Sequence, residues 1–297
     1  MRKIIKTVAA GALLVLTTSG LMAGPAGAAT TVMTATTAAT SSCDDVLFLG
    51  ARGSGEFGPG DYGFNSTRVK GDPKGLGGPV LSSYNEFKGD LGDYSKSVSV
   101  QTVSVSYQAN SAVTTLIRAP HLYFNDLGQG VTSAQNFLVA QAKKCPYQGI
   151  VLSGYSQGAM VMHRVLHNLI NAKTKAYNAI LARVYAAIFI ADGDQVANDN
   201  ETQFGTAPKA ASGIGHWYPA LSGATGAKFP AKYEQMLLRV CNNHDPVCNA
   251  SHTDLNPANL LIHLHYANGG AVLDAADVAA ARVIYNDCGV NPYGNDC

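Results

Sequence analysis

One serine of this chain combines a residue type and a setting that suit nucleophilic chemistry. The sequence GYSQG at residues 154–158 follows an apolar run at 149–153 and precedes residues with helical spacing. A G-x-S-x-G sequence between a strand and a helix is typical of a nucleophile elbow, in which a sharp turn exposes the serine hydroxyl. The pattern alone is weak, because a chain rich in glycine and serine can contain it by chance. Its position between a strand and a helix makes Ser156 the candidate nucleophile.

A serine hydroxyl needs partners to attack at neutral pH. An imidazole must accept its proton, and a carboxylate must hold that imidazole in the required tautomer. On folds with this elbow the order along the chain is serine, carboxylate, histidine. Asp245 lies after a short predicted strand, inside the span from Cys241 to Cys248, and is the candidate carboxylate. His263 and His265 follow Asp245 at plausible distances, and His244 and His252 are nearer to it. Spacing alone leaves the choice among them open.

The attack also requires donors for the oxyanion of the tetrahedral intermediate. The backbone N–H of Gln157, the residue after the nucleophile, is the first candidate. The second should come from the loop after the first strand, where Gly53 and Gly55 allow close backbone approach and Ser54 adds a hydroxyl. We expect Arg52, in the same loop, to be structural.

Metal chemistry is the main alternative use of the histidines. His163 and His167 are four residues apart on the helix expected after the elbow, but Arg164 stands where a zinc protease needs glutamate. His263 and His265 have no further ligand cluster beside them, and the chain contains no C-x-x-C sequence. We therefore expect neither a metal nor a cofactor, and chelator sensitivity would reveal a zinc hydrolase instead.

The elements that must position these residues alternate between strands and helices. Strands are predicted at residues 45–51, 98–107, 149–153, 184–191 and 236–240, and helices at 76–91, 130–144, after the elbow, and from 274 to 284. Asp274 is expected to cap the last helix, with Leu273 and Val278 as a hydrophobic staple. Strands that are apolar on both faces predict a parallel sheet covered by helices on two sides. Ser54, Ser156 and Asp245 each follow a strand, so we expect them to meet at the carboxyl edge of the sheet.

Two long connections, at residues 108–125 and 192–232, are rich in large apolar side chains. Loops of this length are often lids or binding surfaces. The alternative is irregular chain packed over the core, and the sequence does not choose between them.

The beginning of the chain predicts export. Arg2, Lys3 and Lys6 precede an apolar run much shorter than the ~20 residues that span a bilayer. A small-residue site at 26–28 follows, so residues 1–28 resemble a signal peptide and 29–41 a Thr/Ala-rich leader. Residues 42–297 should form one domain, which we expect to be secreted, extracellular and monomeric. With a net charge of +1 and 14% charged residues, the chain shows no basic stripe for nucleic acid or anionic membranes, and no membrane segment should remain after cleavage.

Six cysteines in an exported chain predict three disulfides. Fifteen pairings are possible, and spacing favours Cys241–Cys248 and Cys288–Cys297, which leaves Cys43–Cys145. The last bridge would close a loop of about 100 residues, worth roughly 4 kcal/mol in a chain-entropy model.

Taken together, five segments resemble the cutinase family, which includes cutinases, acetylxylan esterases and related secreted bacterial esterases. These segments are Arg52-Gly53-Ser54, Cys145-Pro146, the GYSQG elbow, Asp245-Pro246-Val247-Cys248 and His263-Leu264-His265-Tyr266. The resemblance covers about residues 43–287. It implies a compact α/β-hydrolase fold, a three-layer α/β/α sandwich with a central five-stranded parallel sheet.

The resemblance also assigns roles. It implies Ser156 as nucleophile, Asp245 as the orienting carboxylate, and Ser54 with Gln157 as the oxyanion hole. The family's histidine precedes x-x-Tyr, which selects His263 over His265. The family's disulfides match Cys43–Cys145 and Cys241–Cys248. The two long connections depart from the compact fungal members, so an open, lidless cleft does not follow from the resemblance.

The hypothesis is a secreted serine esterase that hydrolyses carboxylic esters through an acyl-enzyme. The apolar loops favour cutin-like polyesters or lipids as substrates, and acetylated xylan is the alternative. A catalytically silent binding protein on the same scaffold is the rival from another class. Because a histidine base must be neutral, activity should fall below roughly pH 6–7.

Overall fold

The computed structural model describes residues 43–56, 72, 74–95, 97–112, 119–219, 226–267 and 269–288. The expected signal peptide and leader, residues 1–41, lie outside the described residues, as does Cys297 of the expected Cys288–Cys297 bridge. Among the described residues, no helix is both long enough and apolar enough to cross a membrane.

A single parallel sheet forms the centre of the fold. Its strands are β1 (Val46–Ala51), β2 (Val100–Ser104), β3 (Gly149–Tyr155), β4 (Val184–Ile190), β5 (Thr202–Phe204) and β6 (Leu237–Val240). The order across the sheet is β2-β1-β3-β4-β6-β5, and every neighbouring pair is parallel. The five expected strands are present, and the three-residue β5 adds a sixth at the edge.

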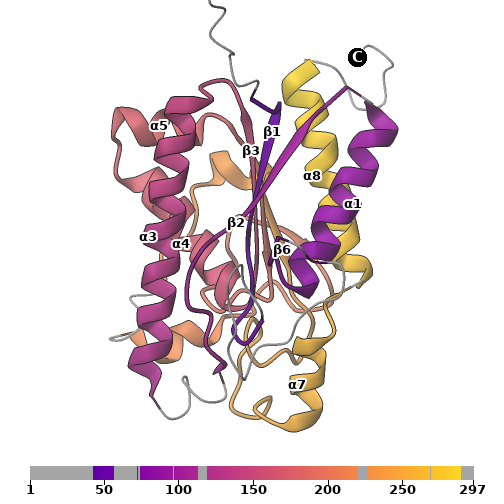
Figure 1. Ribbon diagram of the computed structural model, residues 1–297. Helices are drawn as coiled ribbons and strands as arrows, with labels where there is room; N and C mark the ends of the chain where they lie inside the picture. The colour runs from indigo at the N-terminus through magenta and orange to yellow at the C-terminus, as the bar shows by residue number, and fades with distance from the viewer. Residues whose placement is uncertain are drawn as a thin grey trace, which may run out of the picture. The chain divides into compact units, whose positions relative to one another are not determined.

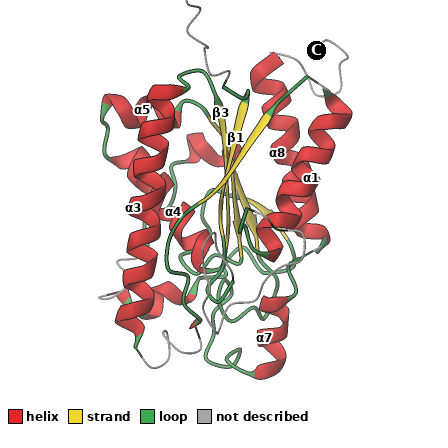
Figure 2. Cartoon of the chain, in the orientation of Figure 1, coloured by secondary structure: helices red, strands yellow, loops and turns green. Residues whose placement is uncertain are grey.

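Helices cover both faces of the sheet (Figure 1, Figure 2). On one side lie α1 (Gly78–Tyr94) and α8 (Gly270–Cys288), and on the other α3 (Pro120–Lys144), α4 (Gln157–Asn171) and α5 (Lys175–Leu181). The short α7 (Pro257–Leu264) lies beyond the end of the sheet in the same view. The fold is therefore the predicted three-layer α/β/α arrangement.

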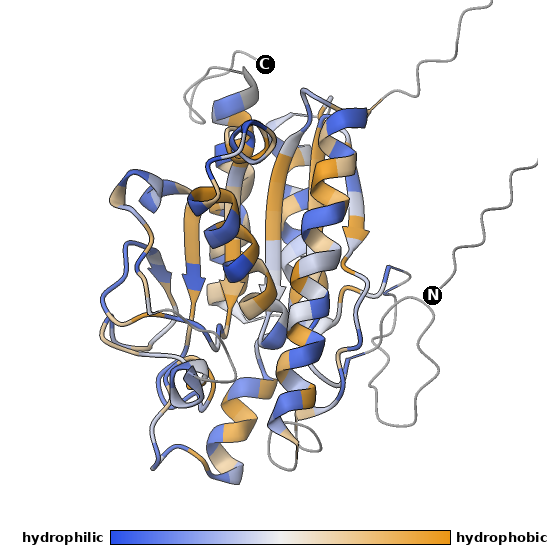
Figure 3. Cartoon of the chain, turned by 90° about the vertical axis from the view of Figure 1, so that its left-hand side faces the viewer, coloured by the Kyte–Doolittle hydropathy of each residue, from blue (hydrophilic) through white to orange (hydrophobic). Residues whose placement is uncertain are grey.

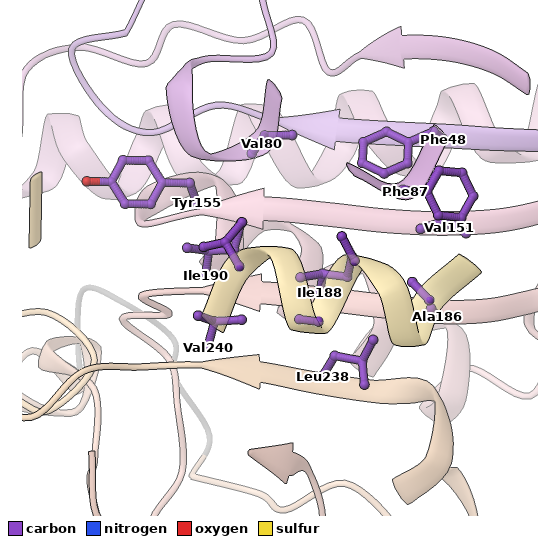
Figure 4. Packing of buried hydrophobic residues seen from close by; sticks show 14 of the residues in the cluster. Phe48, Val80, Phe87, Val151, Tyr155, Ala186, Ile188, Ile190, Leu238 and Val240 are labelled. Carbon is purple, nitrogen blue, oxygen red and sulfur yellow. The ribbon is translucent and has the colours of Figure 1, made fainter. Parts of the chain in front are cut away.

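Alternation along the strands builds two hydrophobic cores. Phe48, Val151 and Ile188 pack toward α1 and α8 (Figure 4), whereas Leu49 and Leu152 belong to the core on the α3 and α4 side. All five side chains are fully buried. The central strands are accordingly hydrophobic along most of their length (Figure 3). Burying each such side chain contributes about 1.5–3 kcal/mol, which holds the strand ends at fixed positions.

Two helix boundaries differ from the sequence prediction. Helix α3 begins at Pro120 rather than near residue 130, because proline is well suited to the first turn of a helix. Part of the first long connection is thus helical, and Tyr123 and Phe124 are buried in the core. Helix α8 begins at Gly270, so Asp274 lies inside the helix on its exposed side and does not cap it.

Helix α7 was not predicted, although its start carries local signals. The Asn256 side chain accepts a hydrogen bond of 3.0 Å from the N–H of Asn259, and Pro257 follows the cap. With eight residues, this helix is too short for apolar periodicity to identify it.

The second long connection is tied down by hydrogen bonds in its described part. The Asp199 carboxylate accepts the N–H of Phe229 at 2.8 Å, and the Asn200 amide donates to the carbonyl of Phe229 at 2.7 Å. Phe229 is fully buried. These contacts favour packing over the core for residues 199–200 and 229; residues 220–225 lie outside the described part.

Candidate active site

Ser156 occupies a sharp turn between β3 and α4. Its backbone has φ 54° and ψ −118°, a left-handed conformation that costs a non-glycine residue about 1–3 kcal/mol. The N–H of Ser156 donates to the carbonyl of Ile190 in β4 at 2.8 Å, which secures the turn to the sheet.

The two glycines of the elbow are required by close backbone contacts. A Cβ on Gly154 would lie 2.3 Å from the carbonyl oxygen of Gly158, and one on Gly158 would lie 2.1 Å from the carbonyl oxygen of Ala51. The absence of side chains lets the start of α4 press against the end of β1. This contact brings the N–H of Gln157 and the loop that carries Ser54 to the same edge of the sheet.

Asp245 lies in the loop after β6, inside the disulfide Cys241–Cys248. Its Oδ1 accepts the N–H groups of Val247 at 2.7 Å and Cys248 at 3.2 Å. Burial by itself would raise the pKa of Asp245, but the charge of His263 and hydrogen bonds from His263, Val247 and Tyr266 outweigh it and hold the pKa below its ordinary value. The group is thus kept as a carboxylate.

His263, on α7, lies between the other two residues. Its Nε2 is 3.0 Å from Ser156 Oγ, and its Nδ1 is 3.0 and 3.1 Å from the two carboxylate oxygens of Asp245. All three side chains are buried. The structure therefore brings hydroxyl, imidazole and carboxylate into one hydrogen-bonded row.

Two tyrosines, Tyr155 and Tyr266, hold this row in place. The Tyr155 hydroxyl donates to the carbonyl of His263 at 2.6 Å, and its ring stacks on the imidazole with centroids 5.2 Å apart. Tyr155 lies at the carboxyl end of the core (Figure 4). The Tyr266 hydroxyl hydrogen-bonds Asp245 and accepts the N–H of Asn242 at 2.8 Å. Tyr155 belongs to the G-x-S-x-G motif and Tyr266 to the His-x-x-Tyr motif, but neither motif indicates these hydrogen bonds.

The other candidate histidines have different partners. His265 is exposed, with Nδ1 2.5 Å from the carbonyl oxygen of Leu261. His244 is paired with Asp254 at 3.0 Å, with 59% of its side chain exposed. His252 is exposed and stacks on Trp217.

The helical pair His163 and His167 lies away from this row. His163 Nδ1 is 2.6 Å from Asp192, and the two imidazoles stack with centroids 5.0 Å apart. They line a half-open pocket of about 350 Å³, together with Arg164 and Asp194, which pair at 2.5 Å. No group of three or more potential metal ligands occurs among the described residues.

The loop after β1 is held by Arg52. This fully buried guanidinium donates to the carbonyls of Tyr107 at 2.6 Å, Glu56 at 3.0 Å and Val105 at 3.4 Å. On the other side of the expected oxyanion hole, the Gln157 side chain donates to the carbonyl of Tyr123 at 3.0 Å. Arg52 has the structural contacts expected of it.

Two of the expected disulfides lie within the described residues. Cys43–Cys145 joins residues 102 apart in sequence, and Cys241–Cys248 closes the loop around Asp245. A row of serine, histidine and carboxylate at the carboxyl edge of a parallel sheet can activate a hydroxyl for attack on a carbonyl carbon.

Comparison with known proteins identifies the class. Residues 42–283 match the Cutinase family, so the chain belongs to that family, whose members hydrolyse carboxylic esters. The chain is 26% identical over 253 residues to Cutinase CUT2 of Pyricularia oryzae, covering 84% of this chain and 86% of that one.

Solved structures agree on the fold. A cutinase-like protein from Cryptococcus sp. superposes with a TM-score of 0.56 at 18% identity, over 82% of this chain and 97% of the other. The catalytic core of an acetyl xylan esterase from Trichoderma reesei gives 0.52 at 18% identity, over 81% and 100%. The resemblance to the cutinase family and the α/β-hydrolase fold are confirmed.

Proposed function

We propose that this protein is an exported serine esterase that cleaves carboxylic esters through an acyl-enzyme, with Ser156, His263 and Asp245 as its catalytic triad. The observation that carries the proposal is the buried row in which His263 Nε2 lies 3.0 Å from Ser156 Oγ and Nδ1 lies 3.0 Å from Asp245. The two disulfides and the expected signal peptide support export.

Each residue of the row has one task. His263 accepts the proton of Ser156 as its oxygen attacks the ester carbonyl, and Asp245 stabilises the imidazolium. The oxyanion accepts hydrogen bonds from the N–H of Gln157 and from Ser54. His263 then protonates the leaving alcohol, and it later activates the water that releases the acid. No metal or cofactor is needed in this scheme.

The surface beside the row favours esters with apolar acyl groups. Helix α7 places His263 inward, while its exposed side carries leucines. Those on or next to the helix, with 40–57% of each residue exposed, are Leu255, Leu260, Leu261 and Leu264. Exposed leucines so close to a reactive site favour contact with acyl chains, cutin-like polyester or lipid over acetylated polysaccharide.

The catalytic assignment is tested by Ser156→Ala. We expect ester hydrolysis to fall by at least about 10⁴-fold, with the fold intact, because the nucleophile is lost. Intact-mass analysis after treatment with an organophosphonate should show one adduct on the wild type and none on the variant. Ser251→Ala removes a hydroxyl outside the row and is the matched control. Ester turnover or labelling that survives in Ser156→Ala would contradict the proposal.

The substrate class is tested separately with p-nitrophenyl esters from two to sixteen carbons, a polyester and acetylxylan. We expect activity to extend to long acyl chains and to the polyester. Activity confined to acetyl esters would instead favour the acetylxylan esterase alternative. A lack of turnover on every ester, with no phosphonate adduct, would favour a silent binding protein.

A further inference from the structure

The side chain of Glu56 connects the loop of Ser54 to the beginning of α1. Its Oε2 accepts the N–H of Gly53 at 2.7 Å, and its Oε1 accepts the N–H of Gly78 at 2.7 Å. Gly53 directly precedes Ser54, and Gly78 is the first residue of α1. One carboxylate therefore links Gly53 to Gly78, which lies 22 residues after Glu56 in the chain, and uses both of its oxygens to do so.

Glycines make room for this carboxylate. A Cβ on Gly77, which has φ 80°, would lie 2.1 Å from Oε2 of Glu56. A Cβ on Gly53 would lie 3.2 Å from the same oxygen and 2.6 Å from the ring of Tyr155. Tyr155 in turn stacks on His263. The enclosed carboxylate thus shares its surroundings with the catalytic row.

The bonding pattern favours the ionised form of Glu56. A carboxylate accepts strongly at both oxygens, whereas the hydroxyl oxygen of a neutral carboxyl is a weaker acceptor and carries a proton that needs an acceptor of its own. The start of the 17-residue helix α1 also favours a negative charge.

The charges around Glu56 act in both directions. Burial, the largest effect, raises the pKa of Glu56 to about 7, and the neighbouring Asp72 adds to the rise, whereas the two N–H bonds and Arg52 lower it. Asp72 accepts the N–H of Gly77 at 2.8 Å. Among the described residues packed around Glu56, the first turn of α1 carries no acidic side chain, and Tyr155 is held in its neutral form because burial raises its pKa well above the ordinary value.

We propose that Glu56 is a positioning residue of the esterase, whose ionised carboxylate holds the Gly53–Ser54 backbone in the orientation that presents Ser54 to the oxyanion. The inference rests on the proposed function. Glu56 acts through the loop and does not touch the reacting atoms. The need for a tether follows from the loop itself, because Ser54 is flanked by Gly53 and by Gly55, which has φ 81°.

The test is Glu56→Gln, which keeps the shape of the side chain but removes its charge and one acceptor. We expect kcat for a soluble butyrate ester to fall about 10- to 100-fold with KM changed less than about threefold. An oxyanion donor acts mainly in the transition state, and losing one entirely costs about 10²–10³. Glu56→Asp, which keeps the charge but reaches less far, should recover part of the loss. Glu86→Gln on α1 is the control and should match the wild type.

The pH profile separates positioning from a purely structural role. In the wild type, the acid side of kcat/KM should fit two ionisations, one from the imidazole and one from Glu56. In Glu56→Gln it should fit one. Titration of active sites with the organophosphonate should give the same number of sites in both proteins, but slower labelling in the variant.

Several results would overturn the inference. One is an unchanged kcat and acid profile in Glu56→Gln. Another is a loss of activity that follows the fraction of unfolded protein, with normal turnover per titrated site. If Glu56→Gln does not fold, the kcat of Glu56→Asp and the pH profile of the wild type provide the test. A wild-type acid profile that fits a single ionisation would then overturn the inference. If the wild type neither hydrolyses esters nor labels at Ser156, the proposed function fails instead.

Discussion

At the scale of single residues, two aspartate–histidine pairs that are close together in the sequence differ in their surroundings. Asp245 and His263 are both buried, and the imidazole of His263 also hydrogen-bonds the hydroxyl of Ser156. Asp254 and His244 are the same distance apart, 3.0 Å, but the side chain of His244 is 59% exposed. The difference lies in burial and in the third partner, not in the pair itself.

This difference predicts unequal effects of one substitution. Asp245→Asn should lower kcat by about 10³- to 10⁴-fold, because the amide cannot hold the imidazole in the required tautomer. Its oxygen can still accept the N–H groups of Val247 and Cys248, so the fold should persist. Asp254→Asn, measured in the same ester assay with circular dichroism as the check on folding, should stay within about twofold of the wild type. Equal losses in both variants would argue against Asp245 as the orienting group.

At the scale of elements, the two sides of α7 differ in their surroundings. Its inner side presents His263 to the row, and its outer side exposes Leu261 and Leu264, at 54% and 57%. Neighbouring residues of a helix can thus differ completely in environment, because each is rotated by about 100° from the last. The leucines should matter for the substrate and not for the chemistry.

We therefore expect Leu261→Gln/Leu264→Gln to lose binding to insoluble substrate. Removing roughly 1 kcal/mol of apolar contact per leucine predicts about 10- to 30-fold weaker adsorption to polyester particles. Hydrolysis of a soluble acetyl ester should change less than about twofold. Tyr147→Gln, a highly exposed apolar-to-polar change just before β3 and hence at the opposite edge of the sheet, is the control. Unchanged adsorption of the double variant would remove the support that α7 lends to apolar substrates.

At the scale of the whole molecule, the interior holds titratable groups whose protonated forms stabilise the fold. Burial by itself would lower the pKa of His163, but the charge of Asp192 and its hydrogen bond prevail and raise it to about 9. Burial raises the pKa of Glu201 to about 8. Both groups hold a proton in the folded state over a pH range in which the unfolded chain has lost it.

The sign of the resulting pH dependence is the same for both groups. The stabilisation from protonated His163 is fully present below pH 6.5 and is lost as the pH rises through about 9. The stabilisation from protonated Glu201 is fully present below pH 4.5 and is lost as the pH rises through about 8. The free energy of unfolding in urea should therefore be lower at pH 9 than at pH 6. Because one unit of pKa shift corresponds to about 1.4 kcal/mol, we expect a difference of a few kcal/mol. Glu201→Gln should reduce the dependence between pH 6 and 8. A free energy that stays level or rises toward pH 9 would contradict this account.

The sequence predicts the elements whose signals are local. Apolar runs such as those around Phe48, Val151 and Ile188 indicate buried parallel strands, and glycines on both sides of Ser156 indicate the turn. The resemblance to the cutinase family rests on the same segments and is confirmed, as is the fold class. Shorter elements were not predicted, because β5 and α7 contain too few residues to show a periodic pattern. The predicted start of the last helix at Asp274 was wrong, because α8 begins at Gly270.

By itself, then, the sequence determined the class of fold, the family, the turn that exposes Ser156 and the aspartate between two cysteines. It left His263 and His265 at plausible spacing after Asp245, with His244 and His252 nearer, and only the motif with Tyr266 favoured His263. The tertiary structure decided which imidazole faces the serine and showed that the Glu56 carboxylate links the Gly53–Ser54 loop to α1. The physical reason is that the contact between Ser156 and His263 joins residues 107 apart in the chain, and the contact between Glu56 and Gly78 joins residues 22 apart. The distances between these groups depend on how the helices pack against the sheet, and a local sequence pattern does not predict this packing.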